Sequence, residues 1–175
     1  MSRQEPPEAA RGLLAGDPDL IEVTIGQLVV AEAPKRLMTP ALGSCVGVAL
    51  YDPFAQRGAL AHVMLPGPRP ETDDEAPGRF ADYAVPELVK MLRDRGTLTR
   101  RIQARLAGGA AMFKGESSIS TIGARNVAEV KRLLALMSIP VVAEDTGESH
   151  ARTLEMSLAT GDTVVRSYRY GVRRL

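Results

Sequence analysis

The sequence is poor in cysteine, in long apolar runs and in excess charge of one sign, and each absence narrows the range of functions. Its single cysteine excludes an internal disulfide and fits a reducing compartment, where such a thiol is either buried or reactive. No stretch approaches the roughly 18 apolar residues of a membrane span. The N-terminal segment has Pro and acidic residues where a signal peptide needs an apolar block. We therefore expect a cytoplasmic protein that does not insert into membranes.

Charge is almost balanced, because 22 Lys and Arg face 21 Asp and Glu. Such a chain has no general electrostatic attraction to nucleic acid, which we exclude as a partner. The acidic run at 73–75 is better explained by a solvated loop than by metal ligation. The Gly108-Gly109 pair lacks the Lys-Ser/Thr ending of a phosphate-binding loop. We predict no metal and no cofactor.

Length and periodicity predict one folded domain. A flexible tail is expected at 1–19, and 20–175 is long enough for one compact domain. Helical spacing predicts helices at 80–92 and 124–137, with Pro86 as a kink or first turn. A Pro-bounded loop is expected at 33–43. Alternating or short apolar runs predict strands at 21–30, 46–51, 60–65, 102–106, 140–144, 153–158 and 163–168. The expected fold class is α/β (α+β), a layered sandwich of a mixed β-sheet and two main helices.

A predicted hairpin brings together the only cysteine and one of the two histidines. Turn chemistry at 52–58 separates two strands, and a turn centre near residues 53–54 puts Cys45 opposite His62. Directly opposed residues share a face of the sheet, with Cβ atoms about 5 Å apart. A register shift of two residues would keep the face and lengthen the gap.

This pairing suggests a nucleophile and its base. A cysteine attacks as the thiolate, so it needs a nearby group such as His62 to take its proton. The imidazole needs a third group to fix its tautomer, and the Thr39 hydroxyl can accept from a ring N–H. Gly43 and Ser44 allow close approach of the backbone to a substrate. Backbone N–H groups around Ser44 and Cys45 are candidate oxyanion donors.

Structural explanations compete with the catalytic one. A lone cysteine on a strand is commonly a small buried hydrophobe, and a histidine near an apolar strand is commonly a satisfied structural residue. His150 is a rival base, but it follows Glu148 and Ser149 in a predicted polar loop, which favours a solvated role. Spacing alone therefore leaves the catalytic interpretation open.

The segment TPALGSCVGVALYDP at 39–53, continued by AHVMLP at 61–66, resembles the signature of the CheD family of chemoreceptor glutamine deamidases. The Thr-to-Cys and Cys-to-His spacings are both similar to those of the family. Weaker motifs follow in consistent order: FADYA at 80–84, AGGAAMF at 107–113, IGARNV at 122–127 and IPVVAED at 139–145.

The resemblance implies an enzyme that hydrolyses the side-chain amide of selected glutamines on chemoreceptor cytoplasmic helices, giving glutamate. It implies Cys45 as nucleophile, His62 as general base and Thr39 as orienting group, with a thioester intermediate. In some bacteria, family members also bind the chemotaxis phosphatase CheC, and Phe113 is a candidate contact for that partner.

The sequence departs from the family pattern at two places. Ala81 stands where the family often has Gly. The segment TGESHAR at 146–152 has one Gly where the family commonly has a Gly pair, which puts the loop 146–151 outside the resemblance. Two alternatives to the deamidase stay open: a receptor methylesterase with the same Cys–His pair, and a non-enzymatic adaptor that binds receptors or CheC.

Overall fold

The computed structural model describes residues 16–73, 75–115 and 121–175 of the chain. Most of the predicted tail, residues 1–15, lies outside these ranges. The end of that segment contacts a neighbouring strand, because Arg36 donates a hydrogen bond of 2.5 Å to the Asp17 carboxylate. Lys35 Nζ lies 3.0 Å from Asp19 Oδ1 in the same region.

The strands form two five-stranded sheets. The first sheet has the order β1-β3-β8-β9-β10, with bounds Leu20–Glu22, Arg36–Leu42, Arg152–Ser157, Thr163–Ser167 and Gly171–Arg174. The second has the order β2-β5-β4-β6-β7, with bounds Leu28–Glu32, Arg57–Val63, Val46–Asp52, Gln103–Gly108 and Val141–Thr146. Each sheet is mixed, because β1 runs parallel to β3 and β6 runs parallel to β7, while the other pairs are antiparallel.

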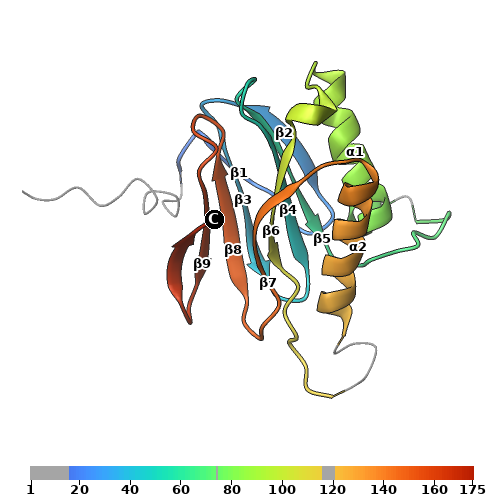
Figure 1. Ribbon diagram of the computed structural model, residues 1–175. Coiled ribbons are helices and arrows are strands. Elements are labelled where there is room, and N and C mark those ends of the chain that lie inside the picture. Colours follow the sequence, from blue (N-terminus) through green and yellow to red (C-terminus); the bar gives the residue numbers. More distant parts are fainter. Residues whose placement is uncertain (1–15, 74, 116–120) are drawn as a thin grey trace, which may run out of the picture.

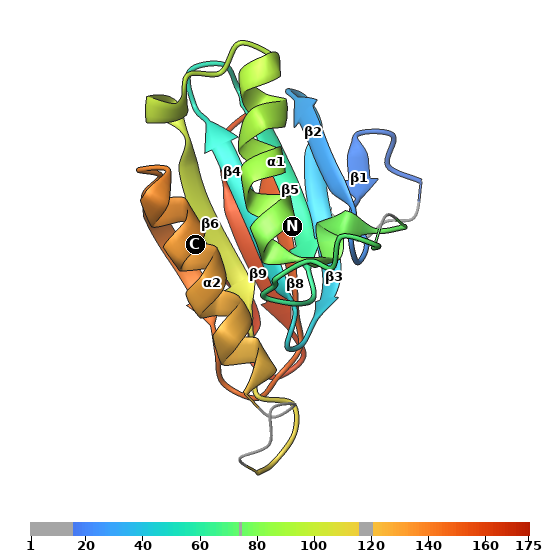
Figure 2. The ribbon, with the colours of Figure 1, turned by 90° about the vertical axis from the view of Figure 1, so that its right-hand side faces the viewer.

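The two sheets and two helices make three layers (Figure 1). Helices α1 (Ala81–Asp94) and α2 (Ile122–Leu136) lie side by side on the outer face of the second sheet, as Figure 2 shows. The first sheet covers the other face. Two short 3-10 helices, Pro77–Arg79 and Thr99–Arg101, lie in the connections. The predicted fold class, a layered α+β sandwich with two main helices, is confirmed.

Alternate residues of β4 and β5 face the two neighbouring layers. Those that pack under the helices are Val46, Val48, Leu50, Ala59, Ala61 and Val63. Ala49 and Leu60 belong instead to the apolar cluster between the sheets. Because side chains alternate along a strand, His62 shares the face of Leu60. Cys45, which directly precedes β4, also packs against the cluster between the sheets.

Two predicted segments were wrong in detail. The strand expected at 21–30 is split into β1 and β2, which belong to different sheets. The loop expected at 33–43 contains β3 despite its proline. The pairing of β3 with β8 shifts register between Thr39 and Leu42. Pro40 lies in this irregularity, where its missing N–H costs the sheet no regular ladder bond.

The remaining elements agree with the sequence pattern. Both predicted helices are confirmed, with bounds that move by one or two residues, and Pro86 lies inside α1. The C-terminal arginine-rich segment adds a strand, β10, which pairs with β9. In the described part of the chain, no helix has both the length and the apolar character needed to span a bilayer.

Candidate active site

Strands β4 and β5 form the predicted hairpin, but its register differs from the expected one by two residues. His62 lies opposite Gly47 and not opposite Cys45. The loop at 53–56 puts the turn centre one residue later than expected. The partner opposite any given residue therefore changes by two positions. Since the side-chain period of a strand is two residues, the shift preserves the shared face. Cys45 and His62 are therefore offset along the hairpin and both directed toward the first sheet.

His62 is oriented by a residue from the opposite sheet. Its side chain is only 2% exposed, and its Nδ1 lies 2.8 Å from the hydroxyl of the fully buried Thr39 in β3. A hydroxyl that accepts from Nδ1–H leaves the lone pair on Nε2. That Nε2 is buried without a hydrogen-bond partner in the described part of the chain. In the tautomer with the proton on Nδ1, Nε2 is the ring nitrogen available to take a proton.

Gly47 provides the space in which Thr39 reaches the ring. A Cβ at position 47 would lie 3.1 Å from the Thr39 methyl group and 2.9 Å from Leu42 Cδ1. Both distances are tighter than ordinary van der Waals contact. A side chain opposite His62 would therefore displace the group that orients it.

The loop at 43–45, between β3 and β4, is held by the end of β6. Gly109 N–H donates to the Cys45 carbonyl and Ala110 N–H donates to the Gly43 carbonyl, each at 2.8 Å. This close approach requires the glycine pair. Gly108 has a φ of +108°, and a Cβ there would lie 2.1 Å from the Cys45 carbonyl oxygen. The segment that follows β6 thus supports the candidate nucleophile.

The backbone N–H groups of this loop differ in their partners. Gly43 N–H donates to the Ala41 carbonyl at 3.0 Å, so it is already engaged. The N–H groups of Ser44 and Cys45 have no acceptor on another residue among those the structure describes. Of the predicted oxyanion donors, these two are the ones left for a substrate. On one side the loop is covered by Met112, whose Cγ would lie 3.2 Å from a Cβ on Gly43.

Asn126 in α2 completes the support, and sequence reasoning assigned it no role. It is fully buried, and its Nδ2 donates to the carbonyls of Ser44 and Met64, both at 2.9 Å. Met64 directly follows β5, so one amide joins the ends of both hairpin strands. A signal was present in the sequence: Asn126 shares helical spacing with Val130 and Leu133 and is a polar residue on a predicted apolar face.

Burial sets the protonation of the two candidate catalytic groups. It raises the pKa of the Cys45 thiol, and this effect outweighs the residue's own backbone N–H, which acts in the opposite direction. Burial also lowers the pKa of His62 to about 4. Both shifts disfavour the charged form of the group. At neutral pH the resting pair is therefore a thiol and a neutral imidazole, not an ion pair.

Other predicted residues lie outside this constellation. Phe113 is 59% exposed on the segment that follows β6. His150 is less solvated than predicted, because its side chain is 12% exposed and its ring packs edge-on against Tyr170 at 4.9 Å between centroids. Its Nδ1 lies 3.6 Å from the Glu148 carboxylate. Among the described residues, no group of three or more His, Cys, Asp or Glu side chains is arranged to hold a metal ion.

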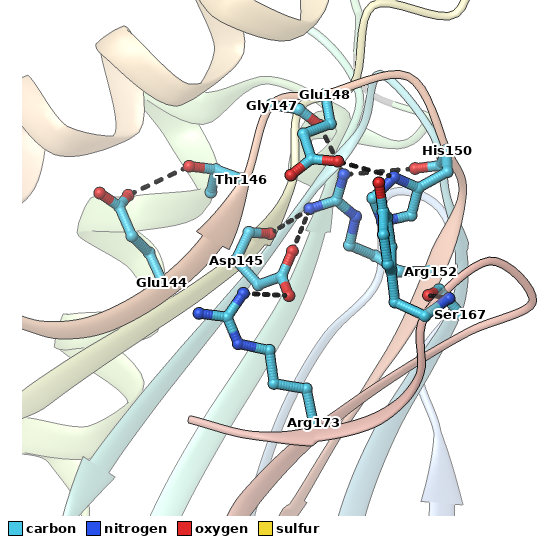
Figure 3. Close-up of polar contacts among 10 residues, drawn as sticks. Glu144, Asp145, Thr146, Gly147, Glu148, His150, Arg152, Ser167 and Arg173 are labelled. Carbon is cyan, nitrogen blue, oxygen red and sulfur yellow. Dashed lines mark hydrogen bonds and ion pairs between the residues drawn. The ribbon is translucent and has the colours of Figure 1, made fainter.

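The loop that follows β7, which departs from the family pattern, is organised by a buried arginine (Figure 3). The Arg152 side chain is fully buried, donates to the Asp145 carbonyl at 2.6 Å and also pairs with the Asp145 carboxylate. Its second terminal nitrogen donates to the Gly147 carbonyl. Ala111 N–H donates to the Glu148 carbonyl at 2.7 Å. This loop is thereby tied to the segment that holds the nucleophile loop.

A groove of about 540 Å³ opens on the helix side of the second sheet. Its walls include Pro66 and Pro68 from the loop that follows β5, Asp82 from α1, and Arg125 and Arg132 from α2. None of the three predicted catalytic residues lines this groove, because they face the first sheet.

Comparison with known proteins identifies the family. The family model described as "CheD chemotactic sensory transduction" matches residues 64–167. A protein of Clostridium novyi named "Probable chemoreceptor glutamine deamidase CheD" is 40% identical over 90% of this chain and 98% of its own length. A protein of Thermotoga maritima named "Chemoreceptor glutamine deamidase CheD" is 46% identical over 82% of this chain and 89% of its own length. Among solved structures, the Bacillus licheniformis hypothetical protein YfiH aligns with a TM-score of 0.47 and 16% identity over 70% of this chain and 51% of its own.

The match to the Clostridium novyi protein necessarily includes the candidate site. It leaves only about a tenth of this chain unaligned, so residues 39–62 in its interior fall within the aligned part. The family model matches more than half of the chain, and several relatives exceed 40% identity over most of it. This chain belongs to the CheD family.

Proposed function

We propose that this chain is a protein-glutamine deamidase that acts in the cytoplasm on glutamine side chains of chemoreceptor helices. The curated relatives carry this activity in their names. In this proposal Cys45 is the nucleophile, His62 the general base and Thr39 the group that orients the imidazole. The observation that supports it most is the 2.8 Å contact between Thr39 Oγ1 and His62 Nδ1, which leaves Nε2 without a partner among the described residues.

The first half of the reaction forms a thioester. The thiol proton of Cys45 passes to His62 Nε2 while the sulfur bonds to the glutamine Cδ, and the carbonyl π electrons move to oxygen. The N–H groups of Ser44 and Cys45 are proposed to stabilise that oxyanion. Collapse of the tetrahedral adduct breaks the C–N bond, and the proton on His62 moves to the departing nitrogen as ammonia leaves. Because burial depresses the pKa of His62 to about 4, its protonated form is a strong acid for this transfer.

The second half regenerates the enzyme. Neutral His62 takes a proton from water as the water oxygen bonds to the thioester carbon. The adduct then expels the Cys45 sulfur, which regains a proton from His62, and glutamate is released. The sum is one amide and one water converted to one carboxylate and ammonium, with no redox change.

Incubation with a chemoreceptor cytoplasmic fragment tests the proposal directly. Peptide mass mapping should find glutamine converted to glutamate, with one ammonia released per conversion. Cys45→Ala and His62→Asn should abolish the conversion, whereas His150→Asn, a change at the other histidine, should preserve it. No conversion by the wild-type protein, or equal conversion by Cys45→Ala, would contradict the assignment.

The same assay separates the alternatives. A methylesterase would release methanol from a methylated fragment and leave glutamines unchanged. A non-enzymatic adaptor would bind the fragment without converting any residue, and its biological effect would survive Cys45→Ala. Release of ammonia alone supports the deamidase.

We also propose that the exposed Phe113 contacts a partner protein of the CheC type. Its neighbour Met112 packs over Gly43, so a partner bound there would lie beside the nucleophile loop. Phe113→Ala should weaken binding of CheC by at least tenfold while leaving the alkylation rate of Cys45 unchanged. Tyr168→Ala, a change at a fully exposed aromatic in the turn between β9 and β10, is the matched control and should not alter CheC binding.

A further inference from the structure

Asn126 holds the peptide bond that leads into the candidate nucleophile. It is fully buried, and its Nδ2 donates to the carbonyls of Ser44 and Met64, both at 2.9 Å. Two carbonyl acceptors determine which end of the amide faces the loop, since the oxygen end would repel both. Both N–H donors of the Asn126 amide are therefore used, one on the loop that leads into β4 and one on the residue that follows β5.

The Ser44 carbonyl and the Cys45 N–H belong to the same peptide unit. In a trans peptide unit, the C=O and the N–H point to opposite sides of the C–N bond. Asn126 comes from α2, which lies on the outer face of the second sheet (Figure 2). A carbonyl directed toward α2 turns the Cys45 N–H away from the helix layer. That direction is toward the face where Thr39 and His62 lie.

The Cys45 N–H is also unoccupied by the rest of the fold. No other residue in the described ranges accepts a hydrogen bond from it, whereas the Cys45 carbonyl is engaged by Gly109 at 2.8 Å. A backbone donor at the nucleophile itself, aimed at the face that carries the base, has the geometry of an oxyanion donor. The support for that donor is the one buried amide of Asn126.

We propose that Asn126 is a positioning residue that orients the Cys45 N–H as an oxyanion donor. This inference rests on the proposed deamidase function and adds a residue to it. When the sulfur bonds to the amide carbon, the carbonyl electron pair moves to oxygen, and the oriented N–H stabilises that charge. Asn126 touches neither substrate nor sulfur and acts through the Ser44–Cys45 peptide.

The test compares reactions that do and do not form an oxyanion. Alkylation of Cys45 by iodoacetamide needs the thiol and the imidazole but creates no negative oxygen. Deamidation does create one. So does addition of the thiol to a peptide aldehyde, in which the glutamine side-chain amide is replaced by an aldehyde: the S–C bond forms, the carbonyl π electrons move to oxygen, and the thiol proton passes to His62 Nε2.

Asn126→Ala should lower kcat for glutamine conversion about 10- to 100-fold, less than the 10²- to 10³-fold loss of a whole donor. KM should stay within threefold. The affinity for the peptide aldehyde should fall in parallel with kcat, and the rate and pH dependence of alkylation should stay within threefold. Asn126→Gln retains the amide but displaces it by one methylene, and should show a smaller loss of the same pattern.

Val130→Ala is the matched control, because Val130 is fully buried one turn later on the same helix and packs under the second sheet. It should lower the unfolding midpoint and leave kcat and aldehyde affinity within threefold. The inference is overturned if kcat and aldehyde affinity of both Asn126 variants equal wild type, if alkylation falls as much as kcat, or if Val130→Ala reproduces the loss. Alkylation and aldehyde binding need no receptor, so they test Asn126 even if the receptor fragment proves not to be a substrate.

Discussion

Acid should destabilise this protein through one identifiable side chain, His62. Burial holds the pKa of its imidazole at about 4 in the folded protein, whereas an unfolded chain has the ordinary value of about 6.5. Between these values the unfolded state binds more protons than the folded state. The stability that comes from keeping the ring neutral is therefore complete above about pH 6.5 and is lost as the pH falls toward 4.

The size of the effect follows from the two pKa values. Each unit of difference corresponds to about 1.36 kcal/mol, so the whole window is worth about 3 kcal/mol. About 2 kcal/mol of this should disappear between pH 7 and pH 4.5. The sign is unambiguous, because protonation favours the unfolded chain.

Denaturant unfolding of the wild type and of His62→Asn, at pH 7 and pH 4.5, measures the contribution of His62 to the free energy of unfolding. Asparagine keeps an amide donor near the position of Nδ1, toward Thr39, and does not titrate. All other groups titrate in both proteins, so their contributions cancel in the comparison. The wild type should lose about 2 kcal/mol more than the variant on acidification. Equal losses in the two proteins would refute the argument that a neutral, desolvated ring is built into the fold.

Three further changes test the supports of the site. Thr39→Val removes the acceptor of the imidazole and should lower kcat about 10- to 100-fold, whereas Thr39→Ser should retain most activity; an active Val variant would contradict the orienting role. Gly109→Ala should have a free energy of unfolding roughly 1–3 kcal/mol lower than that of Gly115→Ala. Both positions have positive φ, but only a Cβ at Gly109 meets a methyl group, at 2.3 Å. Equal stabilities of the two variants in thermal unfolding would disprove this packing. Arg152→Met removes the donor of the loop carbonyls and leaves the Asp145 carboxylate with only the exposed Arg173 at 3.4 Å, and it should cost about 3–5 kcal/mol in urea unfolding; a neutral result would mean that the buried pair is replaceable.

Part of the candidate site was predictable because it depends on strand period alone. Cys45 and His62 differ by 17 in residue number, an odd difference, and flank one turn, so a register error of two leaves them on the same face. The expected pairing was indeed off by two, and the shared face survived. The strand at 36–42 was not predictable, because Pro40 and Pro34 are typical of a loop, and only pairing with β8 across a register irregularity places it in a sheet.

The sequence by itself therefore determined the fold class, the two faces of the hairpin and the candidate pair, since alternation and turn chemistry are properties of neighbouring residues. Only the tertiary structure brought the predicted Thr39 to the ring, and it alone added Asn126 as a further support. The contact between Thr39 and His62 joins two sheets, and Asn126 reaches the nucleophile loop from a helix more than 80 residues later in the chain. Burial, which shifts the pKa of both candidate catalytic groups, exists only when the sheets close over them, because desolvation depends on contacts between segments distant in sequence.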